Sequence, residues 1–103
     1  MKLMFSTQLS YYRSIPIETD EGVVSRSWLG TPTGTVDATT YPASSRRMQE
    51  IYGQRLNQMV NLITYDDVLK VNDRVDVRGQ TYEVVGIMQY SSHNELDLEL
   101  VQV

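Results

Sequence analysis

The chain has 103 residues, a formal net charge of −4, 41% hydrophobic residues and no cysteine. A chain of this length forms one domain with a single modest core, here spanning residues 1–103. The absence of cysteine excludes a disulfide scaffold and a thiolate metal site. The acidic balance argues against general affinity for nucleic acid, which needs Lys and Arg to displace phosphate counterions.

The sequence predicts neither a targeting segment nor a membrane-spanning segment. Residues 1–5 are mostly apolar but give way at once to polar residues, so the apolar region of a signal peptide is not formed. No apolar run is long enough to span a bilayer. We therefore expect synthesis in the cytosol and no membrane partner.

A β-hairpin is predicted near the start of the chain. Residues 10–17 have the composition of a strand, which Pro16 restricts to a sheet edge or a strand end. A turn signal follows at residues 19–22, and residues 23–29 return as a second strand with alternating side chains. After the Gly-Thr-Pro-Thr-Gly turn of residues 30–34, the β-branched content of residues 35–41 indicates a further strand.

Residues 42–53 change character and predict a short helix. Ser44 or Ser45 can cap this helix and Gly53 can end it. Its apolar side comprises Met48, Ile51 and Tyr52. The same stripe continues to residue 63, so one long helix over residues 44–63 also fits the pattern. The β-rich close at residues 60–65 favours a short helix followed by a strand.

The segment from Val71 to Met88 predicts two strands around a tight turn. Val75 and Val77 alternate with charged residues, and Gly79-Gln80 fits a two-residue loop whose first position requires positive φ. This loop would pair Val77 with Tyr82. It would also place Asp76 opposite Glu83, a repulsion that the neighbouring Arg74 and Arg78 could relieve.

The last strand alternates strictly, with leucines on one face and acids on the other, over residues 95–100. Gly86 interrupts the preceding strand and indicates a bulge or bend, with Val84 and Met88 on one face and Val85 and Ile87 on the other. A bent strand that is apolar on both faces is typical of a small barrel. The predicted fold is therefore mainly β, a small antiparallel β-barrel with one short helix. Its core should include Val75, Val77, Tyr82, Val84, Leu96, Leu98 and Leu100.

Catalytic and metal sites find little support in the sequence. His93, the only histidine, lies beside Ser91 and Ser92, but adjacent turn residues rarely form the ordered triad that a serine nucleophile needs. Glu95, Asp97 and Glu99 place three carboxylates on one strand face, yet a flat row cannot wrap around Ca²⁺. The solvated face of an edge strand explains them more simply. We expect no enzyme, no cofactor and no metal.

Binding to another macromolecule is better supported. Arg46, Arg47 and Arg55 form a local positive cluster that could touch phosphates or a partner's acids, or could simply be solvated. Seven tyrosines and one tryptophan accompany a single phenylalanine, and tyrosine and tryptophan are favoured in protein–protein contacts. An interaction surface therefore outranks an active site. These aromatic residues are Tyr11, Tyr12, Trp28, Tyr41, Tyr52, Tyr65, Tyr82 and Tyr90.

The run Asp73-Arg74, then Gly79, then Tyr82-Glu83-Val84-Val85-Gly86-Ile87, followed by His93 and an acidic-apolar strand, resembles the head–tail joining or head-closure (stopper) proteins of long-tailed bacteriophages. The order of the preceding elements, from residue 10 onward, is similar as well. Five residues match at motif level and are interpreted as fold determinants: Asp73, Arg74, Gly79, Tyr82 and Gly86.

The resemblance implies a virion structural protein that is present in the host cytoplasm during assembly. Such proteins form a ring below the portal or its adaptor, close the DNA channel, and offer the surface to which a tail-completion protein attaches. DNA passes without sequence-specific binding. Closure in that family is ascribed to a loop that projects into the lumen, and the candidate here consists of Gly30, Thr31, Pro32, Thr33, Gly34, Thr35, Val36, Asp37, Ala38, Thr39 and Thr40.

Two alternatives remain open on the sequence. The first is a nucleic-acid-binding small barrel of the OB or SH3-like type, against which the net charge counts. The second is another head or tail completion protein with a similar barrel.

Overall fold

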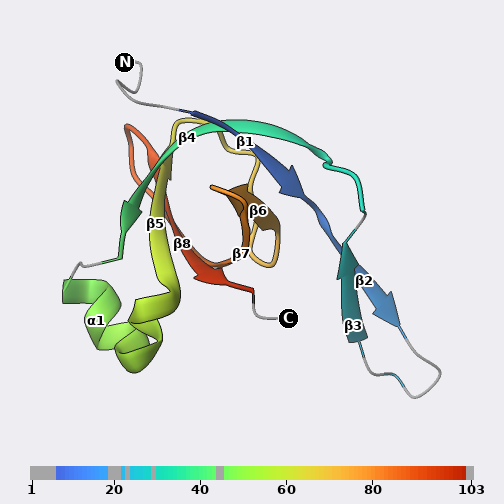
Figure 1. Cartoon of the computed structure of the whole chain (residues 1–103), viewed down its shortest axis with the longest axis horizontal. Coiled ribbons are helices and arrows are strands. Elements are labelled where there is room, and N and C mark those ends of the chain that lie inside the picture. The colour runs from blue at the N-terminus through green and yellow to red at the C-terminus, as the bar shows by residue number, and fades with distance from the viewer. Residues whose placement is uncertain (1–6, 19–21, 23, 29, 44–45, 102–103) are drawn as a thin grey trace.

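The computed structural model describes residues 7–18, 22, 24–28, 30–43 and 46–101. Within these residues strands dominate, and one α-helix interrupts them, followed by a short 3-10 helix, η1 (Figure 1). The elements are β1 (Thr7–Tyr12), β2 (Ser14–Glu18), β3 (Val24–Trp28), β4 (Gly34–Pro42), α1 (Arg46–Tyr52), η1 (Gly53–Gln58), β5 (Met59–Thr64), β6 (Arg74–Val77), β7 (Gln80–Gln89) and β8 (Asn94–Leu100).

Six strands form a closed antiparallel barrel in the order β1, β4, β5, β8, β7, β6, and β6 pairs back with β1. β2 and β3 form a separate two-stranded sheet that extends away from the barrel (Figure 1). The predicted fold class is confirmed. The predicted strand over residues 10–17 is two strands, since β1 ends at Tyr12 and β2 begins at Ser14.

The core fills the inside of the barrel with aliphatic side chains from nearly every strand. Leu96 and Leu98 of β8 are buried against Leu62 of β5 and Val84 of β7. Tyr82 is half-buried and packs against this cluster. The buried core of the barrel comprises Val36, Ala38, Leu62, Leu69, Val75, Val77, Val84, Leu96 and Leu98. The predicted core is thus largely confirmed, with Leu100 only half-buried.

The turn between β6 and β7 lies one residue earlier than the sequence predicted. Arg78 and Gly79 both have positive φ, 51° and 80°, and are the two loop residues, as in a type I′ hairpin turn. Val75 therefore pairs with Tyr82. The valines keep the predicted face because the pairing shifts by two residues, an even number. Asp76 faces Thr81 instead of Glu83, so the predicted repulsion does not arise.

The predicted bulge at Gly86 is present, as the pairing of β7 with β8 shifts between Val84 and Gly86. Because the bulge adds one residue, it changes which side chains face the core beyond it. Ile87, opposite Leu96, packs against the core. The prediction that Met88 shares the face of Val84 was therefore wrong.

The short helix followed by a strand is confirmed, and one long helix over residues 44–63 is not formed. α1 ends at Tyr52, and Gly53 has a φ of 56°, as a helix-terminating glycine does. Met48 is fully buried, whereas Ile51 is 59% exposed, so Ile51 does not belong to the buried side. The predicted capping residues, Ser44 and Ser45, lie outside the described residues.

Candidate functional site

The predicted channel-closing loop, Gly30–Thr40, is mostly not a loop. Gly34 to Thr40 belong to β4, which pairs with β1 on one side and β5 on the other. Thr33 is also tied down, because its amide donates to the Tyr11 carbonyl and its hydroxyl accepts from the Arg13 amide. This segment is therefore part of the barrel wall and its connection to β3.

The element that projects from the barrel is the β2–β3 hairpin (Figure 1). Its base is held by Asp73, whose carboxylate is buried and accepts from the amides of Ser14 (3.2 Å) and Lys70 (2.9 Å). The guanidinium of Arg13 lies 3.1 Å from the same carboxylate. Asp73 thus joins the hairpin to the segment that leads into β6, which gives this motif residue a structural role.

A second contact orients the hairpin from its β3 side. The guanidinium of Arg74 lies 3.6 Å from the ring centroid of Trp28, a close cation–π contact. The indole N–H of Trp28 donates to the Asn72 carbonyl at 2.9 Å. Arg74 also pairs with Glu83, 3.5 Å away. The adjacent motif residues Asp73 and Arg74 therefore hold the two strands of the hairpin, one each.

A cluster around Asp97 fixes α1 to the outside of the barrel. Arg47 of α1 donates two hydrogen bonds to the Asp97 carboxylate, at 2.8 and 3.1 Å, and the Tyr52 hydroxyl donates a third at 2.8 Å. Asp97 is 3% exposed. Interpreting residues 95–99 as the solvated face of an edge strand was wrong, because β8 lies between β5 and β7 and the α1 side chains cover it.

The ionisation of this cluster follows from burial and hydrogen bonding. The pKa of Tyr52 is raised to about 12, mainly by burial of its phenol and secondly by its hydrogen bond to Asp97. The hydrogen bond to Asp97 raises the pKa of Arg47. Next along the strand, the hydrogen bonds from Arg55 lower the pKa of Glu99. The phenol of Tyr52 is thus held protonated and the two carboxylates face paired arginines.

A side chain at Gly86 would crowd this cluster. A Cβ atom at this position would lie 3.0 Å from the Tyr52 hydroxyl and 3.1 Å from an Asp97 oxygen. Both distances are tighter than ordinary van der Waals contact, so a side chain would push the hydroxyl and the carboxylate away. Gly86, one of the five residues that match the family motif, therefore contributes both to the bulge in β7 and to the attachment of α1.

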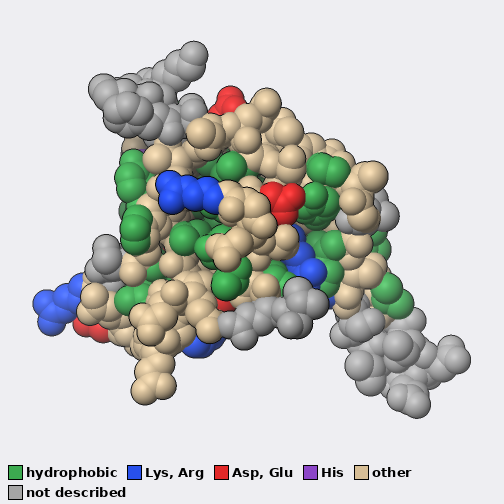
Figure 2. Space-filling model, in the orientation of Figure 1, with side chains coloured by type: hydrophobic (Ala, Val, Ile, Leu, Met, Phe, Trp, Pro, Cys, Tyr) green, Lys and Arg blue, Asp and Glu red, His purple; other side chains and the backbone are tan. Residues whose placement is uncertain are grey.

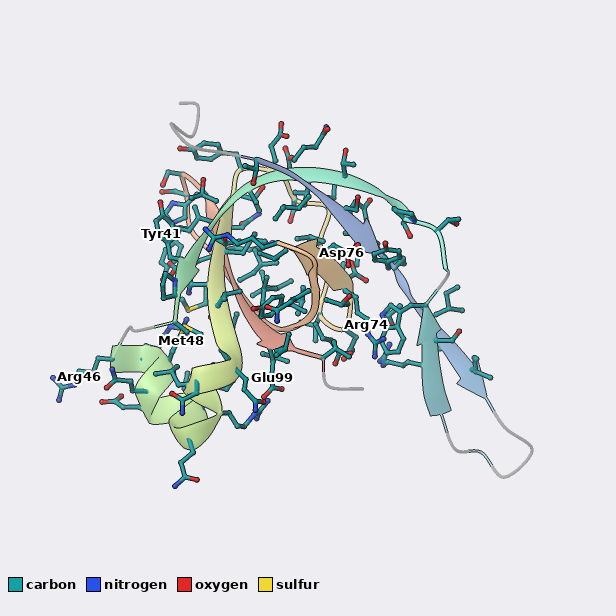
Figure 3. All side chains as sticks on the ribbon, viewed as in Figure 1. Tyr41, Arg46, Met48, Arg74, Asp76 and Glu99 are labelled. Atoms are coloured by element: carbon teal, nitrogen blue, oxygen red, sulfur yellow. The ribbon has the colours of Figure 1, made fainter. Side chains whose placement is uncertain are left out.

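The three arginines predicted to form one positive cluster have separate roles. Arg47 and Arg55 are paired with Asp97 and Glu99, respectively. Arg46 is solvated, and among the described residues its one ion pair is with Glu50, one turn along the helix (Figure 3). The charges of Arg47 and Arg55 thus hold the helical segment against β8 and are not free to attract a ligand.

The turn at His93 has only local contacts among those observed. Ser92 Oγ lies 2.9 Å from His93 Nδ1, and the ring of Tyr90 stacks on the imidazole at 5.0 Å between centroids. Among the described residues, no three His, Cys, Asp or Glu side chains come together as metal ligands would.

The tyrosines divide between the interior and the surface. Tyr11 and Tyr82 pack against the core, and Tyr12 donates to Asp76 at 2.8 Å. Tyr41, Tyr65 and Tyr90 are exposed. Among the described tyrosines, this last group offers the most surface to a partner, and Tyr90 shares its ring with the stacked His93.

The fold places the chain in a class of small closed antiparallel barrels that other solved structures share. One is the phage-like element PBSX protein xkdH from Bacillus subtilis, with a TM-score of 0.64 and 15% identity over 96% of each chain. Another is a protein of Shigella flexneri 2a, with a TM-score of 0.65 and 13% identity over 90% of this chain and 89% of that one. At these identities the likeness concerns the fold.

No protein-family model matches the sequence, and no curated protein matches it either. Within the part of the chain that the structure describes, none of the helices has the length and apolar character needed to traverse a bilayer.

Proposed function

We propose that this chain is a structural protein of a phage or phage-like particle, and that it acts in the head–tail connector as a head-closure component. The observation that carries the proposal is the fold shared with the PBSX protein over nearly the whole length of both chains. That neighbour belongs to a phage-like element, and the motif residues of the sequence point to the same class of protein. The copies would form a ring below the portal or adaptor and present a surface to the tail-completion protein.

Within this proposal, the closing element is the β2–β3 hairpin in place of residues 30–40. The hairpin extends from the barrel, whereas Gly34–Thr40 is built into the wall. Asp73 and the Trp28–Arg74 pair fix the direction in which it points. A hairpin held at its base and repeated around a ring could reach into a central channel.

The surface charges favour a connector protein over a nucleic-acid-binding barrel. Among the described residues, five arginines form ion pairs with acids of the same chain, at positions 13, 46, 47, 55 and 74. On the face shown in Figure 2, charged side chains are scattered, and basic ones do not gather in one groove. Binding along a phosphate backbone needs such a groove.

The proposal is tested by deleting the gene from the phage or prophage that encodes the chain. Electron microscopy and nuclease protection of the lysate should show DNA-filled heads that leak their DNA or lack tails. Supplying the wild-type chain in trans should restore tailed particles. Normal tailed and infectious particles in the deletion lysate would exclude an essential connector role.

A mobility-shift assay at low salt separates the nucleic-acid alternative. Micromolar binding that collapses as salt rises would favour that alternative, since phosphate contacts release counterions. We expect no shift at micromolar concentrations of the chain.

A further inference from the structure

A cavity of about 480 Å³ lies beside the base of the β2–β3 hairpin, on the outer side of β6. Arg74 and Asp76 are two positions apart on β6, so they share the face opposite the buried Val75 and Val77. Both lie on the side of the barrel toward the hairpin (Figure 3). We call this site the hairpin-base cavity, and its side-chain walls are Tyr12, Trp28, Arg74, Asp76 and Thr81.

Two glycines at the border of the cavity leave it accessible. Gly30 and Gly79 both line it. A Cβ atom added at either position would meet no other atom within 4 Å. The cavity therefore opens to the surroundings of the protein, and a long side chain from another molecule has room to enter.

The carboxylate of Asp76 is the charged group of this cavity that has no ion-pair partner among the described residues. It is half-buried and accepts from the Tyr12 hydroxyl at 2.8 Å and from the Thr81 hydroxyl at 3.1 Å. Arg74, the cation of the cavity, is already paired with Glu83, 3.5 Å away. An excess of negative charge remains at the cavity. Acidic side chains that lose solvent are usually paired, so the cavity favours a cation from outside.

The geometry around Asp76 favours a guanidinium over an ammonium group. A carboxylate has about four acceptor positions, and each oxygen of Asp76 accepts one hydrogen bond within the chain. Each oxygen thus keeps a position for one of the two parallel N–H groups of an arginine fork. The rings of Tyr12 and Trp28 line the same cavity, and guanidinium groups stack on such rings. The Arg74 guanidinium already lies 3.6 Å from the Trp28 ring centroid.

We propose that the hairpin-base cavity binds an arginine side chain of a partner protein, with the guanidinium paired to Asp76 beside Tyr12 and Trp28. A basic contact segment on the partner complements the net charge of −4 of this chain. Trp28 belongs to β3 and Asp76 to β6, so one bound arginine contacts the hairpin and the barrel at the same time. The inference goes beyond the proposed function, because it holds whether or not the chain closes a channel.

The test uses the single tryptophan of the chain as its reporter. The blocked tripeptide acetyl-Gly-Arg-Gly-amide is titrated into the folded protein while the indole N–H resonance of Trp28 is followed by NMR. We expect a saturable shift with a dissociation constant of about 1–10 mM, the range for one side chain. The citrulline tripeptide, which has nearly the same shape without the charge, should bind about tenfold more weakly. The lysine tripeptide should also bind more weakly, since it offers no fork.

Variants of the protein separate this cavity from general charge attraction. Asp76→Asn should weaken binding of the arginine tripeptide about tenfold. Asp37→Asn is the matched control, because it removes the same charge at an exposed position of β4 outside the cavity, and it should leave binding unchanged. Thr81 lies opposite Asp76, so Thr81→Lys supplies an internal cation and should abolish binding. This third variant decides the question if Asp76→Asn fails to fold by circular dichroism.

Several results would overturn the inference. Equal binding of the citrulline tripeptide, or equal losses in Asp76→Asn and Asp37→Asn, would mean that Asp76 does not receive the cation. Binding retained in Thr81→Lys, or no shift of the indole resonance in the wild-type protein, would place the arginine elsewhere or nowhere. A lysine tripeptide that binds as well as the arginine one would refute the choice of a guanidinium. The deletion phenotype is independent of these results, because a chain can be essential for tail joining without this contact.

Discussion

The hydroxyl of Tyr52 donates to Asp97 at 2.8 Å across a strand position that carries no side chain, Gly86. The two residues are 45 positions apart in the sequence. Their contact, together with the paired hydrogen bonds from Arg47, fastens α1 to the barrel. The cluster depends on a helix, a bulge and a buried acid at once, so it can be tested at each of them.

The substitution Gly86→Ala should lower stability through this cluster. The added methyl group would crowd the Tyr52 hydroxyl, and overpacking at such a site costs about 1–3 kcal/mol. In a Tyr52→Phe background one of the two crowded atoms is gone, so the same substitution should cost less. Urea unfolding of the four proteins of this cycle measures the difference. Strictly additive effects would mean that Gly86 matters only for the bulge.

Removing the guanidinium at position 47 should leave Asp97 without its main partner. The expected cost of Arg47→Ala is about 1.5–3 kcal/mol, because a buried carboxylate then lacks charged hydrogen bonds. The neighbouring Arg46→Ala, whose side chain is 92% exposed, should stay within about 0.5 kcal/mol of wild type. Urea midpoints of the two variants provide the comparison, and similar losses would contradict the different roles assigned here.

Stability should fall in strong alkali because of Tyr52. Its folded-state pKa of about 12 lies above the ordinary value of 10.0, so the unfolded chain releases this proton first as the pH rises. The stabilisation is complete below pH 10 and is lost between pH 10 and about 12. Melting temperatures from pH 8 to 12 should decline less steeply in Tyr52→Phe. Ultraviolet titration of the folded proteins should lose one late-titrating phenol in that variant, and an unchanged titration would refute the assignment.

The leucines of β8 should carry much of the core stability. Leu98 is completely buried, and Leu98→Ala should cost about 2–5 kcal/mol through lost burial and the cavity left behind. Val68→Ala, at a position 37% exposed, serves as the control and should have little effect. The check is the urea midpoint at constant slope. An unchanged midpoint for Leu98→Ala would show that this side chain does not pack as described.

The β6–β7 turn should be sensitive to substitution of Gly79 and tolerant of the changes tested at its two neighbours. Gly79→Val places a β-branched residue at a φ of 80° and should lower the melting temperature clearly. Gln80→Val lies in β7 and should be tolerated. Arg78→Gly should change stability little. Glycine removes the strain of positive φ at this position, but it also raises the conformational entropy of the unfolded chain, and the two effects oppose each other. A clear loss in Arg78→Gly would return the turn to the position expected from the sequence, because Arg78 would then lie in a strand, where glycine is destabilising.

The alternation of side chains made much of the barrel predictable. Leu96 and Leu98 were assigned correctly because a period of two leaves one choice of face. The turn at residues 78–79 was missed because a shift of two residues preserves that face, so the pattern does not distinguish the two pairings. What separates them is the pairing of Arg74 with Glu83, a contact between strands.

The role of Asp97 was not predictable from local pattern. An acid between two leucines is typical of a solvated outer face, and the covering residues come from a helix about 50 positions earlier. The sequence did offer one signal. The helical region carries two arginines, at positions 47 and 55, that could form ion pairs with acids elsewhere in the chain. Which acids they meet depends on closure of the barrel.

Pro16 in β2 has a consequence for how the chain behaves when many copies accumulate. Free strand edges are templates for uncontrolled stacking into fibrils. The six barrel strands have neighbours on both sides, so among the described strands the open edges belong to the hairpin. Proline offers no amide hydrogen there and interrupts any added strand. Addition of a further strand along the β2 edge should therefore be disfavoured when many copies accumulate.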